Sequence, residues 1–114
     1  MSNETVLEEA NRLIHGDRQQ AYGHPANDYT CNGRIWAAVL KHWLNTKHPD
    51  LLREPIPDIP PEIGCLMMVG VKMTRAAVNP GKRDSWVDMA GYAGCGAMCV
   101  ERAEDKADDA NTLR

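Results

Sequence analysis

Apolar residues near the start of the chain recur with the period of a helix. Polar side chains separate them, and the apolar positions are Val6, Leu7, Ala10, Leu13 and Ile14. This spacing places them on one face of an α-helix. Thr5 followed by Glu8 fits a capping box, and Gly16 fits a helix stop. The pattern therefore predicts a short amphipathic first helix.

The next two segments predict a bend and a second helix. The polar stretch after Gly16 has room for a further turn of helix, but glycine and proline favour a bend near Tyr22–Pro25. From about Ala26 to Leu44, apolar residues again form a stripe with polar residues opposite. The stripe consists of Ile35, Trp36, Val39, Leu40 and Trp43. We expect a second helix over this range.

The middle of the chain changes from proline-rich to apolar. Residues 45–62 contain five of the seven prolines, so they predict a long, stiffened connection. Pro60 and Pro61 suit the start of a third helix, and Glu62 in its first turn favours the helix dipole. Residues 63–73 are apolar nearly all round. We therefore expect the third helix to be central and buried.

A fourth helix is expected from about Asp84 to Ala103. It contains three glycines, which are unfavourable inside a helix. The commoner explanation is the close approach of another helix, and the alternative is the close approach of a ligand. Residues 105–114 are charged, lack apolar spacing and are expected to fray. With no alternating strand pattern, the fold class is all-α. We predict a small bundle of about four helices, with a Pro-rich connection between helices 2 and 3 and one domain over residues 1–104.

Composition narrows the function classes. A net charge of −3 argues against general nucleic-acid binding, although it leaves room for a local basic pocket. No apolar run is long enough to span a membrane, and the acidic, polar N-terminus does not resemble a signal peptide. Cys95 and Cys99 share a helix face, where buried free thiols are favoured over half of a metal site. We expect a cytoplasmic protein with reduced thiols.

Two aspartates and one tyrosine of the fourth helix are candidate site residues. Asp84, Asp88 and Tyr92 are four residues apart and lie along one side of the helix. Asp84 is also explained as a first-turn acid. Asp88 lies inside the helix, where aspartate needs a reason. It could form a structural salt bridge with Lys72 or Arg75, or it could coordinate Mg²⁺, and the spacing alone leaves both open.

Cations and a second tyrosine supply a possible phosphate and base site. Lys72 and Arg75 are three apart near the end of the third helix, where they either leave the core or form a pair that binds phosphate. Arg18 and Tyr22 precede the Gly–Pro bend. Arg18 could bind phosphate and Tyr22 could stack on a base, or Tyr22 could fill the bend.

Several of these motifs together resemble a known family. They are Gly-Asp-Arg at residues 16–18, Tyr-Gly-x-Pro at 22–25, Lys-x-x-Arg at 72–75 and Asp-x-x-x-Asp-x-x-Gly-Tyr at 84–92. In this order, over roughly residues 6–100, the pattern resembles a family of small bacteriophage proteins of unassigned function. The resemblance implies a location in the cytoplasm of the infected bacterial host.

More distantly, the helical layout resembles the MazG-type all-α nucleoside-triphosphate pyrophosphohydrolases. That resemblance implies a homo-oligomer in which acids hold Mg²⁺ and basic residues hold the triphosphate. The matching positions here are Asp84 and Asp88 for metal, and Lys72 and Arg75 for phosphate. The superfamily's Glu-x-x-Glu and Glu-x-x-Asp pairs have no counterpart at that spacing, so the implied metal site is smaller, differently built or absent.

Three functional hypotheses follow. The first is a Mg²⁺-dependent pyrophosphohydrolase of a (deoxy)nucleoside triphosphate, with catalytic metal ligands Asp84 and Asp88. Its nucleotide-binding residues would be Lys72, Arg75, Arg18, Tyr22 and Tyr92. The second is a non-catalytic nucleotide-binding protein, such as one that sequesters a host immune signal, and the missing acidic pair favours it. The third is a structural or partner-binding helical protein in which Asp88 pairs with Lys72 or Arg75.

Overall fold

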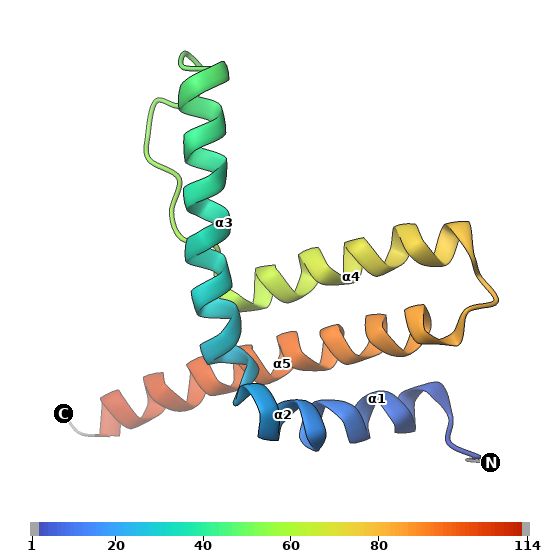
Figure 1. Cartoon of the computed structure of the whole chain (residues 1–114). Coiled ribbons are helices and arrows are strands. Elements are labelled where there is room, and N and C mark those ends of the chain that lie inside the picture. The colour runs from blue at the N-terminus through green and yellow to red at the C-terminus, as the bar shows by residue number, and fades with distance from the viewer. Residues whose placement is uncertain (1–2, 113–114) are drawn as a thin grey trace.

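The computed structural model describes residues 3–112 as five α-helices, with no strand in that range. The helices are α1 (Val6–His15), α2 (Asp17–Tyr22), α3 (Pro25–Lys47), α4 (Pro61–Val78) and α5 (Arg83–Thr112). The long helices α4 and α5 run antiparallel, α1 packs along α5, and α3 stands across them (Figure 1). The prediction of a small all-α bundle with a Pro-rich connection is confirmed.

The N-terminal boundaries follow the local signals in the sequence. The Thr5 side chain accepts a hydrogen bond from the Glu8 N–H at 3.1 Å, as the capping box predicts. The further turn of helix exists as α2, and it ends at Gly23, whose φ of 78° is the left-handed conformation that glycine adopts easily. His24 then caps α3, because its Nδ1 accepts from the Ala26 N–H at 3.0 Å.

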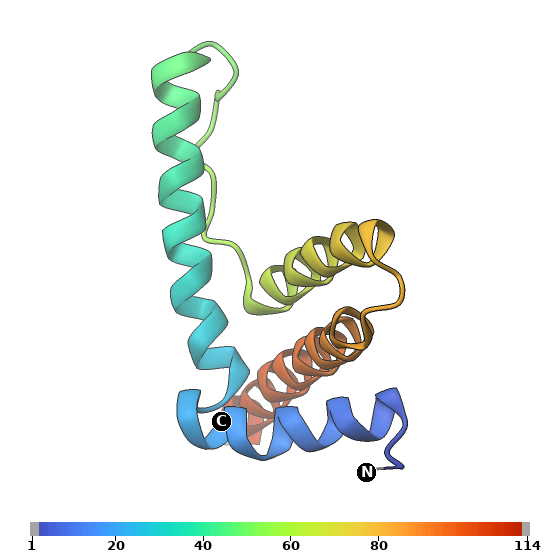
Figure 2. The same ribbon diagram turned by 45° about the vertical axis from the view of Figure 1, so that its right-hand side comes forward.

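The far half of α3, residues 34–47, projects from the rest of the molecule and is called the arm (Figures 1 and 2). The proline-rich residues 48–60, called the strap, return along it. The strap joins α3 where the Ile59 N–H donates to the Gly33 carbonyl at 3.3 Å. A Cβ on Gly33 would lie 1.9 Å from the Ile59 carbonyl oxygen. Glycine at this position is therefore what lets the strap pack against the helix.

The core lies where α3, α4 and α5 meet. Tyr29, Cys65 and Cys99 are its buried members, and Trp36 and Tyr92 pack against them. Burial raises the pKa of both buried thiols above the ordinary value. All four cysteines are free.

The glycines of α5 mark close helix contacts, as predicted. A Cβ on Gly94 would lie 2.7 Å from Cδ1 of Ile14 in α1, and one on Gly91 would lie 3.5 Å from the same side chain. On the α4 side, a Cβ on Gly96 would lie 3.4 Å from the Cys65 Cβ. Glycine inside a helix lowers its stability, and here the close packing of α5 against helices on two sides explains why glycine is present.

The prediction that the third helix is buried is wrong for one of its faces. In α4 the buried residues are Gly64, Cys65 and Ala76, whereas Leu66 is 59% and Met73 is 58% exposed. The reason is geometric, because α5 and the start of α3 cover one side of α4 and nothing in residues 3–112 covers the other. An apolar pattern predicts that a helix can be buried, and a neighbour must be present to bury it.

The fourth predicted helix was placed too short, because α5 continues past Ala103 to Thr112. The expectation of fraying over residues 105–114 is therefore corrected for residues 105–112, and 113–114 lie outside the described residues. Alanine, glutamate and lysine are good helix formers, and no glycine or proline interrupts residues 97–112. Residues 103–110 are all exposed, so this end is a helix without a packing partner in the chain.

No helix among residues 3–112 combines the length and the apolar character needed to cross a bilayer.

Candidate functional site

A cavity of about 400 Å³ lies where α1, α2 and the first turns of α3 meet α5. Its lining residues are Ile14, Arg18, Gln19, Tyr22, Gly23, Pro25, Asp28, Tyr29, Tyr92 and Cys95. We call it the tyrosine cavity. The chain turns sharply at Gly23, so that the start of α3 stands at the end of α2 and forms one wall (Figures 1 and 2). Its size and mixed lining are typical of a small-molecule site.

Two of the three tyrosines pack against each other and the third is exposed. Tyr29 and Tyr92 meet edge to face, with ring centroids 6.3 Å apart and planes at 87°. Burial, and then the neighbouring Tyr92, raise the pKa of Tyr29, so its hydroxyl stays protonated at neutral pH. Tyr22 is 73% exposed at the rim. The cavity thus combines a packed aromatic wall with an exposed aromatic side chain at its rim.

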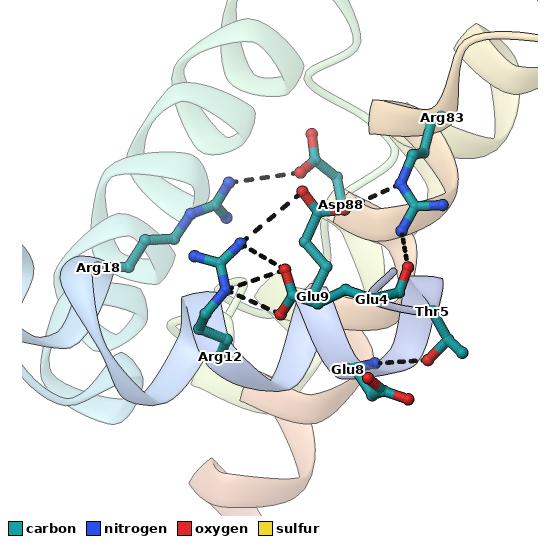
Figure 3. A network of polar contacts seen from close by, with 8 residues as sticks. All are labelled: Glu4, Thr5, Glu8, Glu9, Arg12, Arg18, Arg83 and Asp88. Carbon is teal, nitrogen blue, oxygen red and sulfur yellow. Dashed lines mark hydrogen bonds and ion pairs between the residues drawn. The ribbon is translucent and has the colours of Figure 1, made fainter. Parts of the chain in front are cut away.

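A three-residue charge cluster adjoins the cavity. Arg18 Nη2 donates to Asp88 Oδ1 at 3.3 Å, and Lys72 Nζ lies 3.0 Å from Asp88 Oδ2 (Figure 3 shows the Arg18 contact). Each carboxylate oxygen therefore has its own cation. Lys72 is only 14% exposed, whereas Arg18 is 41% exposed and also lines the cavity. The cluster itself carries a charge of +1, and the Asp28 carboxylate in the cavity lining lies on the other side of that balance.

A second ion-pair network fixes α1 on the start of α5. The Arg83 guanidinium donates to Glu9 at 3.0 Å and to the Glu4 carbonyl at 2.9 Å (Figure 3). Arg12 pairs with the Glu4 carboxylate at 2.9 Å. These groups are substantially exposed, so each pair contributes little to stability. The consequence is positional, because the network sets where α1 and the following Arg18 lie along α5.

The structure brings together most of the predicted site residues. Arg18, Tyr22 and Tyr92 line the tyrosine cavity, and Lys72 and Asp88 adjoin it through Arg18. Two predicted residues lie elsewhere. Asp84 is exposed in the first turn of α5, as its alternative explanation requires.

Arg75 contributes to a different hollow. It lines a cavity of about 420 Å³ at the turn between α4 and α5, together with Thr74, Val78, Asn79, Lys82 and Ser85. Because residues three apart on a helix differ by about 60° in direction, Lys72 points toward Asp88 while Arg75 does not. The predicted pair of cations is therefore split between two places.

The donor set fits a magnesium ion poorly. No group of three or more His, Cys, Asp or Glu side chains within the described range could hold a metal ion. Asp88 is occupied by two cations, and Asp84 is exposed at the helix start. A dication at Asp88 would have to displace Lys72 and Arg18 against charge repulsion.

Two residues of the cavity were missed by the sequence analysis as site residues. Asp28 and Tyr29 lie in the first turns of α3, a few residues after the Gly23 bend. The sequence feature that could have identified them is the bend at Gly23, because a bend brings the residues on its two sides close together. Asp28 adds a carboxylate that can accept hydrogen bonds from an amino or hydroxyl group.

Comparison with known proteins identifies related sequences. The family described as "Domain of unknown function (DUF6378)" matches residues 5–100. The chain is also 37% identical over 93 residues to the Gene 55 protein of Mycobacterium phage D29, a match that covers 82% of this chain and 52% of that protein. The chain thus spans about half the length of this curated relative. No solved structure matches.

Proposed function

The chain belongs to the DUF6378 family and has a bacteriophage relative, and from its site we propose a function. We propose that it binds a nucleotide in the tyrosine cavity without hydrolysing it. The observation that carries this proposal is Arg18, which lines the cavity and is one of two cations sharing the single carboxylate of Asp88. The predicted phage family is confirmed at this level. The relation to pyrophosphohydrolases stays a prediction.

The aromatic lining supports a base or another flat ring as the ligand. Tyr29 and Tyr92 form a fixed wall, and the exposed Tyr22 can stack on the ring from the rim. Stacking on an aromatic side chain stabilises a bound base by about 1–3 kcal/mol. Asp28 can accept a hydrogen bond from an exocyclic amino group or a sugar hydroxyl, which would contribute selectivity.

The charge cluster supports a phosphate beside that ring. Arg18 is exposed enough to turn its guanidinium from Asp88 to a phosphate, which a planar fork of N–H donors binds in two places. Lys72 would keep Asp88 paired while Arg18 moves, because it has its own carboxylate oxygen at 3.0 Å. The arrangement therefore offers a cation to the ligand without leaving a buried charge unpaired.

Binding without turnover accords better with these contacts than hydrolysis does. The acids that would hold a metal are either paired with cations or exposed at a helix start. Metal-dependent hydrolysis needs carboxylates free to bind the ion. Hydrolysis stays a prediction that the experiment below measures. We further propose the host cytoplasm, where nucleotides are abundant, as the place where the protein meets its ligand.

The test is calorimetric titration with ribo- and deoxynucleoside mono- and triphosphates, with and without Mg²⁺, together with an assay for pyrophosphate release. We expect binding of at least one nucleotide and no release. Arg18→Gln should weaken the affinity roughly tenfold or more, because a charge-assisted hydrogen bond is lost. Tyr22→Ala should weaken it by a similar factor.

The matched control is Arg34→Gln, the same substitution at an arginine on the arm whose side chain is 68% exposed and lies outside the cavity. Its affinity should equal that of the wild type. A folded protein that binds none of these nucleotides contradicts the proposal. Pyrophosphate release that depends on Asp88 would replace it with the hydrolase hypothesis.

A further inference from the structure

The chain exposes far more surface than a compact protein of its size. Its accessible surface is 8213 Å², whereas a folded monomer of 12.7 kDa has about 6,200 Å². Its radius of gyration is 17.2 Å, against about 13 Å for a compact domain of this length. The excess of about 2,000 Å² is too large to come from surface roughness. It follows from the way α3 stands away from the antiparallel pair (Figures 1 and 2).

The excess surface is of two kinds. The polar end of α5 accounts for part of it, because residues 103–110 are exposed on all sides. The rest lies over α4 and the arm, where the exposed side chains are large and apolar. They include Ile35, Val39, Trp43, Ile63, Leu66, Met67 and Met73. Apolar residues gathered on one side of a molecule mark an interaction site rather than ordinary surface.

The uncovered side of α4 has the pattern of a helix seam. Its residues are spaced three and four apart in alternation, and we call them the outer α4 face: Ile63, Leu66, Gly70, Met73 and Ala77. This is the spacing by which two helices pack lengthwise. A Cβ on Gly70 would meet no atom within 4 Å, so a second backbone can approach closely here. Residues 63–71 carry no charge that would oppose burial.

We propose that a second copy of this chain covers the outer α4 face, forming a two-fold symmetric dimer in which α4 packs against the partner's α4. The area fits, because permanent homodimers bury about 1,000 Å² or more from each partner. The composition fits as well, since permanent interfaces are more apolar than transient ones. A face that is apolar at all times needs a partner that is present at all times, and another copy of the chain meets that condition.

The arm carries a further exposed apolar surface. A hollow of about 470 Å³ on it is lined by Val39, Trp43 and neighbouring residues, and it is open to a large apolar side chain. The tyrosine cavity shares no residue with the outer α4 face or with this hollow. The proposed dimer therefore uses none of the residues that line the cavity.

Sedimentation velocity and light scattering test the dimer. The wild type should have twice the 12.7 kDa mass of the chain. Leu66→Glu should weaken the association by roughly 100-fold, because it places a charge within the apolar seam. The matched control is Leu7→Glu, the same substitution at a leucine of α1 that is 71% exposed and far from the seam. It should remain dimeric.

A second measurement keeps the test valid if Leu66→Glu loses its fold along with its partner. Met73→Cys in a Cys31→Ser background should be joined to a second chain by a short bis-maleimide, because it lies on the seam and Cys31 is the exposed thiol of the wild type. Leu7→Cys in the same background should not be joined. A wild type that is a folded monomer overturns the proposal and leaves the face to a different protein. A dimer that persists in Leu66→Glu and is not joined at residue 73 also overturns it.

Discussion

The two sides of the α4–α5 pair are completed in different ways. On the junction side, where α1, α2 and the first turns of α3 meet α5, Asp88 is paired with two cations, and Ala10, Ile14 and Tyr29 are buried within one chain. On the outer side, formed by the outer α4 face and the arm, large apolar side chains remain uncovered. Residues 63–71 of α4 are uncharged all round the helix, so the sequence does not distinguish its covered side from its uncovered side. The difference shows that a pattern specifies a face suited to burial but not the surface that buries it.

Gly33→Ala should have the largest effect, because it acts where the arm is joined to the strap. The new Cβ would lie 1.9 Å from the Ile59 carbonyl oxygen, so backbone must move. We expect a loss of about 3 kcal/mol or more in the free energy of unfolding, measured by urea denaturation. Gly81→Ala is the control, because the nearest atom to its Cβ would be 3.9 Å away. An equal, small effect in both variants would mean that the arm is not held by the strap.

Asp88→Asn should have the next largest effect and acts on the junction side. It leaves Lys72, only 14% exposed, without its carboxylate partner. We expect a loss of about 2 kcal/mol in the free energy of unfolding. Asp84→Asn is the same substitution at an exposed residue of the same helix and should be near neutral.

The same pair of variants distinguishes two roles for Asp88, a structural salt bridge and a metal ligand. Nucleotide affinity should not fall in Asp88→Asn, because this carboxylate competes with a phosphate for Arg18. Calorimetric titration of the variant, performed under conditions where it is folded, measures this. A complete loss of binding that depends on Mg²⁺ would show instead that Asp88 holds a metal ion.

Protonation of His24, at the edge of the junction, should have the smallest effect on stability. Desolvation first, and then Arg102 and Lys106, lower its pKa from 6.5, and its Nδ1 must be neutral to accept from Ala26. The folded state therefore binds fewer protons than the unfolded state below pH 6.5. The stability that the neutral cap supplies is complete above that pH and is lost as the pH falls through the lower folded pKa.

Thermal unfolding measured from neutral to mildly acidic pH tests this dependence. The expected loss on acidification is about 1 kcal/mol at most, the value of a helix cap. His24→Asn keeps an acceptor at the cap and should flatten that part of the pH profile. His42→Asn, at an exposed position on the arm, should leave the profile unchanged. Equal profiles in the wild type and His24→Asn would contradict the assignment.

The sequence predicted those parts of the fold that depend on neighbouring residues. The cap at Thr5, the bend at Gly23 and the start of α4 at Pro61 each follow from local chemistry. The end of α5 was placed too early, because apolar spacing ends near Ala103 while helix propensity continues. Helix propensity and packing stabilise a helix independently, and residues 103–110 are helical through propensity without packing against another element.

The candidate site was predictable in part for the same reason. Arg18 and Tyr22 precede a bend, and bends gather polar groups, so their shared cavity was foreseeable. The pairing of Asp88 with both Lys72 and Arg18 was not, because residue 18 lies seventy positions away in sequence. The spacing of Lys72 and Arg75 suggested one pair, but they differ by about 60° in direction, so Lys72 meets Asp88 while Arg75 lines a separate hollow.

The packing of α1 on α5 has a consequence for synthesis of the protein. The buried side chain of Ile14 lies against Gly91 and Gly94, nearly eighty residues later in the chain. The first helix therefore leaves the ribosome long before its docking surface is made, and a short helix alone in water is marginally stable. Closing so long a loop is slow compared with forming local turns. The docking of α1 must therefore wait until Gly91 and Gly94 have been synthesised, and until then the nascent α1 is exposed to chaperones and proteases.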